Sequence, residues 1–184
     1  RLTMKNAIKE YADIDVDSLG DDELFALPQQ HHIKVKGVRS RGTVIAALFD
    51  ELCSAKIVEP THVTDHPKET TPLCKLHRDD PALIERFESF ICGLEISNAY
   101  SELNDPVVQR ELLEAQAKEL GGGDEEAHPM DEDFLTAIGY GMPPTGGLGL
   151  GIDRMIMFLT GQLSIRDVIL FPTLKMEKPN EKKK

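Results

Sequence analysis

The stretch TGGLGLGIDRMIMFL at 145–159 has glycine at every second position from Gly147 to Gly151. This alternation predicts a strand with one side bare of side chains, which a planar ring or a neighbouring backbone can approach closely. A helix is expected to follow directly from Asp153, with Arg154 in its first turn. An arginine there suits phosphate oxygens, because its guanidinium offers paired donors. The stretch therefore fits a nucleotide lying on the strand with its phosphates towards Arg154.

Of two other interpretations of this stretch, a Rossmann fingerprint is excluded and a tightly packed glycine-rich strand stays open. A Rossmann fingerprint needs GxGxxG in the turn after a strand, whereas the spacing here is GxGxG and the glycines lie within the strand. That fold is therefore excluded. A glycine-rich strand that only packs tightly against a helix, with Arg154 in an ion pair to Asp153 or Asp167, is equally compatible with the spacing.

A second informative stretch, RFESFICGLEISNAYSEL at 86–103, is rich in β-branched and aromatic residues around Gly93. It predicts two antiparallel strands joined by a tight turn. Glu88 and Glu95 would then lie across from each other or one diagonal step apart. Two such carboxylates make an oxygen-rich site for Mg²⁺, which often binds through one or two carboxylates and substrate phosphates. The alternative is two solvated glutamates on opposite edges.

Asn98, Tyr100 and Glu102 share one side of the second of these strands, because side chains alternate with a period of two. A carboxylate beside an aromatic ring suits an ammonium group through ion pairing and cation–π attraction. A polar outer face with Tyr100 half-buried is the alternative. Glu95 has the opposite parity from Asn98. If both serve one site, the strand needs a bulge or break between Ile96 and Asn98, and we predict one there.

The remaining patterns predict helices interspersed with short strands. The expected helices run from a Thr3 cap towards Glu10 and over 21–30, 43–57, 106–120 and 134–141, and a further strand over 61–64 ends at a turn over 65–67. Strand pairs and helices without regular βαβ alternation favour an α+β fold, in which helices flank an antiparallel sheet.

The composition bounds the class of protein. The chain has 184 residues and a formal net charge of −11, which disfavours a large surface for a nucleic-acid backbone in this segment. No apolar run is long enough to cross a membrane. The three cysteines form no CxxC pattern, so a reducing cytoplasm is the simplest location, and Cys53 and Cys92 are expected to be inert core thiols. The basic residues 175–184 are expected to form a disordered tail.

GLGLGIDRMIMFLTG, followed by SIRDVILFP, resembles motif 3 of the class II aminoacyl-tRNA synthetases, here at 146–172, and most of all the subgroup that charges lysine, aspartate and asparagine. LEISNAYSELNDP, at 94–106, is similar to lysyl-tRNA synthetases specifically. Further similar segments are THVTDHP, TTPL, HRDDP and PVVQRELLEAQAKE. The resemblance spans residues 1–174 and implies the C-terminal portion of a class II synthetase catalytic domain.

The resemblance implies a role for each candidate site residue. The expected ATP contacts are Glu95, Ile96, Gly151, Ile152, Asp153 and Arg154, with Arg154 as the catalytic residue on the γ-phosphate. The expected lysine ligands are Asn98, Tyr100 and Glu102, and the expected Mg²⁺ ligands are Glu88 and Glu95. The implied activity is that of a lysine–tRNA ligase, in which a cytoplasmic homodimer forms lysyl-adenylate from lysine and ATP and transfers lysine to tRNA(Lys).

Three parts of that family's pattern are not visible in these residues: an anticodon-binding domain, motif 1, and motif 2 with the arginine that grips the α-phosphate. Because catalysis of adenylate formation is mostly positioning and charge balance, the chain alone is expected to be weak or inactive. Two alternatives stay open. One is a paralogue that lysylates a protein, of the elongation factor P lysyl ligase type; the other is a non-catalytic binding module derived from a synthetase.

Overall fold

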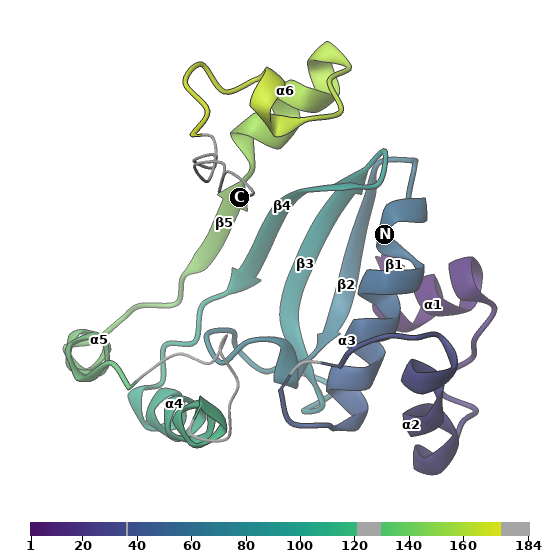
Figure 1. The fold of residues 1–184 in the computed structure, drawn as a ribbon. Coiled ribbons are helices and arrows are strands. Elements are labelled where there is room, and N and C mark those ends of the chain that lie inside the picture. Colours follow the sequence, from purple (N-terminus) through teal and green to yellow (C-terminus); the bar gives the residue numbers. More distant parts are fainter. Residues whose placement is uncertain (36, 121–129, 174–184) are drawn as a thin grey trace, which may run out of the picture. The chain divides into compact units, whose positions relative to one another are not determined.

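The computed structural model describes residues 1–35, 37–120 and 130–173, which form two units that meet in the sequence at Leu150 and Gly151. In the first unit the described strands form one five-stranded sheet in the order β1-β2-β3-β4-β5 (Figure 1). The strands are β1 Leu2–Thr3, β2 Thr61–Pro67, β3 Leu83–Ile91, β4 Leu94–Ser101 and β5 Gly146–Leu150. β1 is parallel to β2, and the other neighbours are antiparallel.

Helices cover part of this sheet. The described α-helices of the first unit are α1 Met4–Ala12, α2 Asp21–Gln30, α3 Arg41–Leu52, α4 Pro106–Leu120 and α5 Glu132–Gly139. α1 and α3 bury the core against β2 and β3, where Val63 and Phe90 are buried and the Phe90 ring meets Phe49 of α3 edge-on at 5.6 Å. We call this side of the sheet the α3 side. The expected α+β fold, an antiparallel sheet flanked by helices, is confirmed.

Side-chain caps explain where the helices begin. Thr3 accepts a hydrogen bond from the Asn6 amide at 3.2 Å and starts α1 as expected. The helix expected over 43–57 begins two residues earlier, because Ser40 accepts the Thr43 amide at 3.1 Å and so acts as the N-cap. The same helix ends at Leu52 and gives way to a short 3₁₀ turn at Ser54–Lys56.

The hairpin between β3 and β4 turns at Cys92 and Gly93, whose φ values are 50° and 73°. Positive φ at both central residues identifies the tight two-residue turn expected of this hairpin. A Cβ at Gly93 would lie 2.7 Å from the Ala55 carbonyl oxygen, so glycine is required there. Cys92 is exposed at this turn, and the expectation of a core thiol is wrong for it. Cys53 is buried, which raises the pKa of its thiol to about 11.

β2 continues beyond the expected stop at residue 64. Asp65 has φ 60°, and the pairing with β3 shifts between Thr64 and His66. This bulge turns His66 inward opposite Ile84, where the imidazole is 1 % exposed and its Nε2 lies 3.2 Å from the Val63 carbonyl oxygen. Burial, reinforced by the positive charge of Arg86, lowers the pKa of His66 to about 4.

Acidification is expected to destabilise the first unit through His66. The folded-state pKa of about 4 lies below the ordinary value of 6.5, so the stabilising contribution is complete above pH 6.5 and is lost as the pH falls towards 4. The loss amounts to about 3 kcal/mol. Urea unfolding of the chain across this window checks it, and His66→Gln should flatten the dependence. Glu85→Gln is the control, because the pKa of Glu85 is held at about 2 by Arg78 and Ser101. Equal slopes with and without His66 would contradict the assignment.

The second unit begins where β5 ends. Gly151 is the N-cap of α6, Ile152–Thr160, and Gly161 ends that helix with φ 68°. The helix therefore starts one residue before the expected Asp153. A short 3₁₀ turn, Ile165–Asp167, follows. The expected basic tail at 175–184 lies outside the described residues.

Candidate active site

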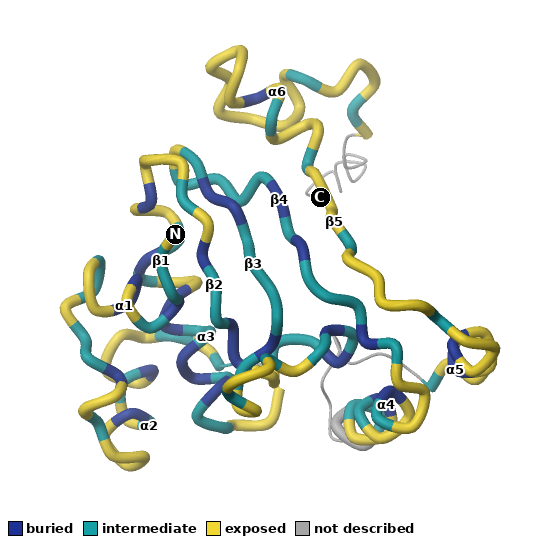
Figure 2. Tube along the Cα trace, turned by 180° about the vertical axis from the view of Figure 1, so that it is seen from behind, coloured by how far each residue is buried: buried dark blue, intermediate teal, exposed yellow. Residues whose placement is uncertain are grey.

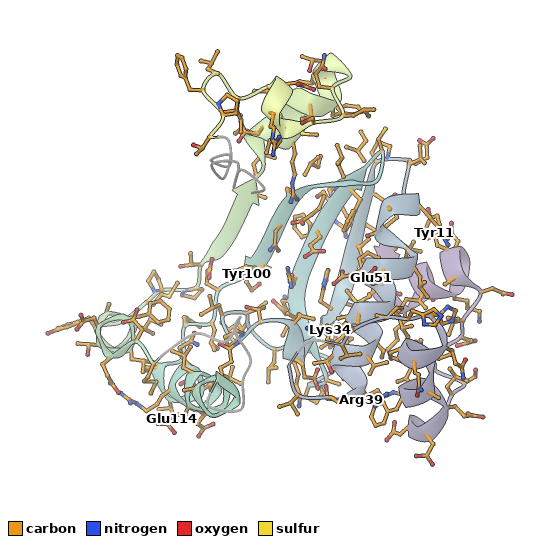
Figure 3. All side chains as sticks on the ribbon, viewed as in Figure 1. Tyr11, Lys34, Arg39, Glu51, Tyr100 and Glu114 are labelled. Atoms are coloured by element: carbon orange, nitrogen blue, oxygen red, sulfur yellow. The ribbon has the colours of Figure 1, made fainter. Side chains whose placement is uncertain are left out.

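The sheet register gathers most of the candidate residues on the α3 side of the first unit. On β3, Glu88 lies between Arg86 and Phe90 on that side, since alternate residues of a strand share a side. Glu88 pairs with Asn98 of β4, and Arg86 pairs with Tyr100. Laterally paired residues share a side as well, so the candidate lysine ligands and a candidate metal ligand face the same way. Figure 3 shows the Tyr100 side chain beside β4.

A bulge in β4 adds Glu95 to this set. Ser89 pairs with Ser97 and the next residue, Phe90, pairs with Glu95, so the ladder skips Ile96. The pairing with Phe90 places Glu95 on the α3 side, one diagonal step from Glu88. A bulge is therefore present as predicted, but the skipped residue is Ile96, one residue before the predicted interval between Ile96 and Asn98. The predicted diagonal arrangement of the two glutamates is confirmed with it.

The donor chemistry of Glu88 and Glu95 fits Mg²⁺. Carboxylates on neighbouring strands, on one side of the sheet, can supply one or two oxygen ligands, and water and substrate phosphates normally complete the shell of this ion. In the described part of the chain, no group of three or more His, Cys, Asp or Glu residues could hold a metal by itself. A metal here would therefore depend on the phosphates of a bound nucleotide.

Glu102 lies just beyond β4, in a bridge to Cys74, and its amide donates to the Thr145 carbonyl at 2.9 Å. Burial raises the pKa of the Glu102 carboxyl. Burial and the nearby Glu102 charge raise the pKa of Tyr100. Both shifts indicate a partly desolvated carboxylate beside an aromatic ring, which an ammonium ligand would stabilise.

One glycine of β5, Gly147, makes room for this carboxylate. A Cβ at Gly147 would overlap a carboxylate oxygen of Glu102, whereas a Cβ at Gly149 would lie at an ordinary 3.6 Å from the Asn98 carbonyl oxygen. The absence of a side chain at Gly147 therefore leaves space for the Glu102 carboxylate. The alternation pattern alone did not reveal this role. Gly151 is not part of the strand but the N-cap of α6.

The remaining candidates belong to the second unit. Ile152, Asp153 and Arg154 form the first turn of α6, directly after Gly151, and all three are exposed. Gly151 gives this helix no side-chain cap. Amide groups at such a helix start, together with the helix dipole, favour an anion. The first turn of α6 therefore has the chemistry of a phosphate site, with Arg154 as its cation.

A hollow of about 710 Å³ lies within the first unit. Its wall includes Arg86 and Glu88 of β3 together with Lys34 and Glu51, which are labelled in Figure 3. Asn98, Tyr100 and Glu102 lie outside that wall. Burial decreases towards β5, whose residues are mostly exposed (Figure 2). The hollow therefore has the volume of a small-molecule pocket, but it covers only the β3 end of the candidate site.

Arg86 is the principal residue of the site that sequence patterns missed. Its Nε donates to Asn98 Oδ1 at 3.0 Å, and its Nη2 donates to Glu88 Oε1 at 2.5 Å. The available signal was its parity, since Arg86 lies two residues from Glu88 and must share its side. The contact with Asn98 depends on the register between β3 and β4, which the sequence pattern did not define to the residue.

Comparisons with known proteins agree over nearly the whole chain. The family described as tRNA synthetases class II (D, K and N) matches residues 1–175. The lysine–tRNA ligase of Christiangramia forsetii is 51% identical over 97% of this chain and 31% of its own length. Those of Thermoanaerobacter pseudethanolicus and Saccharolobus solfataricus are 51% and 49% identical, each over 95% of this chain and 35% of the relative.

These matches show how much of each relative the chain covers and to which family the chain belongs. The chain spans about a third of the length of the curated relatives that it matches. Among the described residues, no helix is long and apolar enough to cross a membrane. The family match covers both units that the structure describes, from β1 to the end of the 3₁₀ turn after α6. The chain belongs to the class II tRNA synthetases of the D, K and N group.

Proposed function

We propose that this chain forms the lysine-binding and ATP-facing part of a lysine–tRNA ligase. The observation that carries the proposal is the row on the α3 side of β4, where Asn98, Tyr100 and the partly desolvated Glu102 lie next to Glu88 and Glu95. A carboxylate in that setting selects an amino acid with a cationic side chain. The names of the relatives, which are lysine–tRNA ligases, support the same substrate.

In the proposed reaction a carboxylate oxygen of lysine attacks the α-phosphorus of ATP, and pyrophosphate leaves. A hydroxyl of the terminal ribose of tRNA(Lys) then attacks the acyl carbon, and AMP leaves. Glu102 and Tyr100 would hold the side-chain ammonium, and Asn98 would orient the bound lysine. Glu95, Ile96, Gly151, Ile152 and Asp153 would border ATP, and Arg154 would bind its γ-phosphate.

Glu88 and Glu95 would hold Mg²⁺, which balances phosphate charge when it is bound. The catalytic contribution of the chain is therefore positioning and electrostatic stabilisation, without a covalent enzyme intermediate. The proposal also includes a homodimer and a cytoplasmic location. Cys53, Cys74 and Cys92 are free thiols, in keeping with a reducing compartment.

Lysine-dependent exchange of pyrophosphate into ATP tests the proposal. The full-length product of the gene that encodes this chain, called the full-length protein below, is expected to catalyse the exchange with lysine and to charge tRNA(Lys). Aspartate and asparagine should be poorer by at least about 10³-fold, because neither offers a cation to Glu102. Exchange with aspartate instead of lysine would reject the substrate. Lysylation of a protein without charging of tRNA would favour the protein-modifying paralogue.

A further inference from the structure

Arg86 occupies the junction between the two halves of the candidate site. Its side chain is 14% exposed, and that of its partner Glu88 is 13% exposed. One guanidinium contacts both Glu88, a candidate metal ligand, and Asn98, a candidate lysine ligand. The register places Tyr100 directly opposite Arg86. A change at this one side chain can therefore reach the metal half and the lysine half of the site together.

The contact with Asn98 sets the direction of its amide group. A guanidinium has donors only, so the amide must turn its oxygen towards Arg86. The amide NH₂ then points away from Arg86 and can donate to an anionic part of a ligand, such as a carboxylate or a phosphate. Without the guanidinium the amide could flip and present its oxygen instead, which would repel an anion. Arg86 thus decides whether Asn98 acts as a donor or as an acceptor.

The contact with Glu88 balances charge within the same site. Glu88 and Glu95 lie one diagonal step apart on neighbouring strands, and like charges so placed destabilise each other. The Arg86 Nη2 atom, 2.5 Å from Glu88 Oε1, offsets this repulsion. It also competes with any cation for Glu88. Removal of the guanidinium charge should therefore strengthen the attraction of the two glutamates for Mg²⁺.

We propose that Arg86 is a positioning residue that orients the Asn98 amide for the lysine substrate and sets the charge of Glu88 for the metal. This inference rests on the proposed function. It assigns Arg86 no contact with substrate, because its described hydrogen bonds go to Asn98 and Glu88. We therefore expect its effects on lysine and Mg²⁺ binding to pass through those two residues.

A double-substitution cycle on the full-length protein tests this assignment. Arg86→Met is expected to raise the KM for lysine about 10–30-fold, with kcat changed by less than about threefold. In an Asn98→Ala background the same substitution should raise KM by less than about threefold, because the amide through which Arg86 acts is gone. The Mg²⁺ concentration for half-maximal exchange should fall about threefold in Arg86→Met and stay unchanged in Arg86→Lys, which keeps the charge.

Arg78→Met is the matched control, since Arg78 pairs with Glu85 on the opposite side of β3, and its lysine KM should change by less than about twofold. If Arg86→Met does not fold, Arg86→Lys serves in the same cycle, with an expected rise in KM of about fivefold. Equal KM effects with Asn98 intact and in the Asn98→Ala background would overturn the proposal. Absence of lysine-dependent exchange in the unsubstituted protein would instead reject the proposed function, which keeps the two failures distinct.

Discussion

Glu102→Gln is expected to lower kcat/KM for lysine by about 10³-fold in the exchange assay, because a desolvated ammonium left without its counter-ion costs about 3–5 kcal/mol. The substitution keeps the shape of the side chain and removes its charge. Burial already raises the pKa of Glu102, and the carboxylate fills the space that Gly147 leaves open. Most of the loss should appear in the KM for lysine, with the KM for ATP changed by less than about threefold.

A substitution in the neighbouring strand β5 tests the position of the same carboxylate. Gly147→Ala should raise the KM for lysine about tenfold, because the new Cβ would displace Glu102. Gly146→Ala is its control, since a Cβ at Gly146 meets no atom within 4 Å. Glu85→Gln controls for the loss of a partly buried carboxylate on the other side of the sheet. A Glu102→Gln protein that uses lysine within about tenfold of the original would refute the assigned role.

The hairpin shows how much of the site local sequence defines. Gly93 between two β-branched and aromatic runs predicts both strands and their turn, and the structure has them. From that turn, parity alone places Asn98 and Tyr100 on one side. The bulge also followed from parity, because Glu95 could join Asn98 only if the strand skipped a residue, and the residue skipped is Ile96.

What the sequence did not reveal depends on contacts between segments distant along the chain. The inward turn of His66 needs the bulge at Asp65, which appears only in the pairing of β2 with β3. The collision of a Gly147 Cβ with Glu102 depends on β5 pairing with β4 in one particular register. Cys92 lies in an apolar run that predicts burial, yet a two-residue turn exposes its central positions. For His66 and Gly147 tertiary geometry overrode a local pattern, whereas the local turn itself exposes Cys92.

Arg154 carries the second large prediction, which concerns the nucleotide instead of the amino acid. Arg154→Gln is expected to lower kcat for lysine-dependent exchange by about 10³-fold, because the lost charge stabilises phosphate oxygens in the transition state. The residue lies in the first turn of α6, where Gly151 provides no side-chain cap and the helix start favours an anion. Arg166→Gln is the matched control in the same unit, from the 3₁₀ turn Ile165–Asp167, and should change kcat by less than about twofold.

The KM values for lysine and for ATP distinguish the role of Arg154 from that of Glu102. Arg154→Gln should leave the KM for lysine within about threefold and raise that for ATP, the reverse of Glu102→Gln. If Arg154 stabilises the transition state, the exchange rate of Arg154→Gln stays low even at saturating ATP. Higher ATP concentrations can compensate only for weaker binding of the ground state. Full recovery of the rate at saturating ATP would therefore show that Arg154 only binds the nucleotide. An equal loss in Arg166→Gln would mean that the positive charge of the second unit, and not the position of Arg154 at the start of α6, is what the reaction needs.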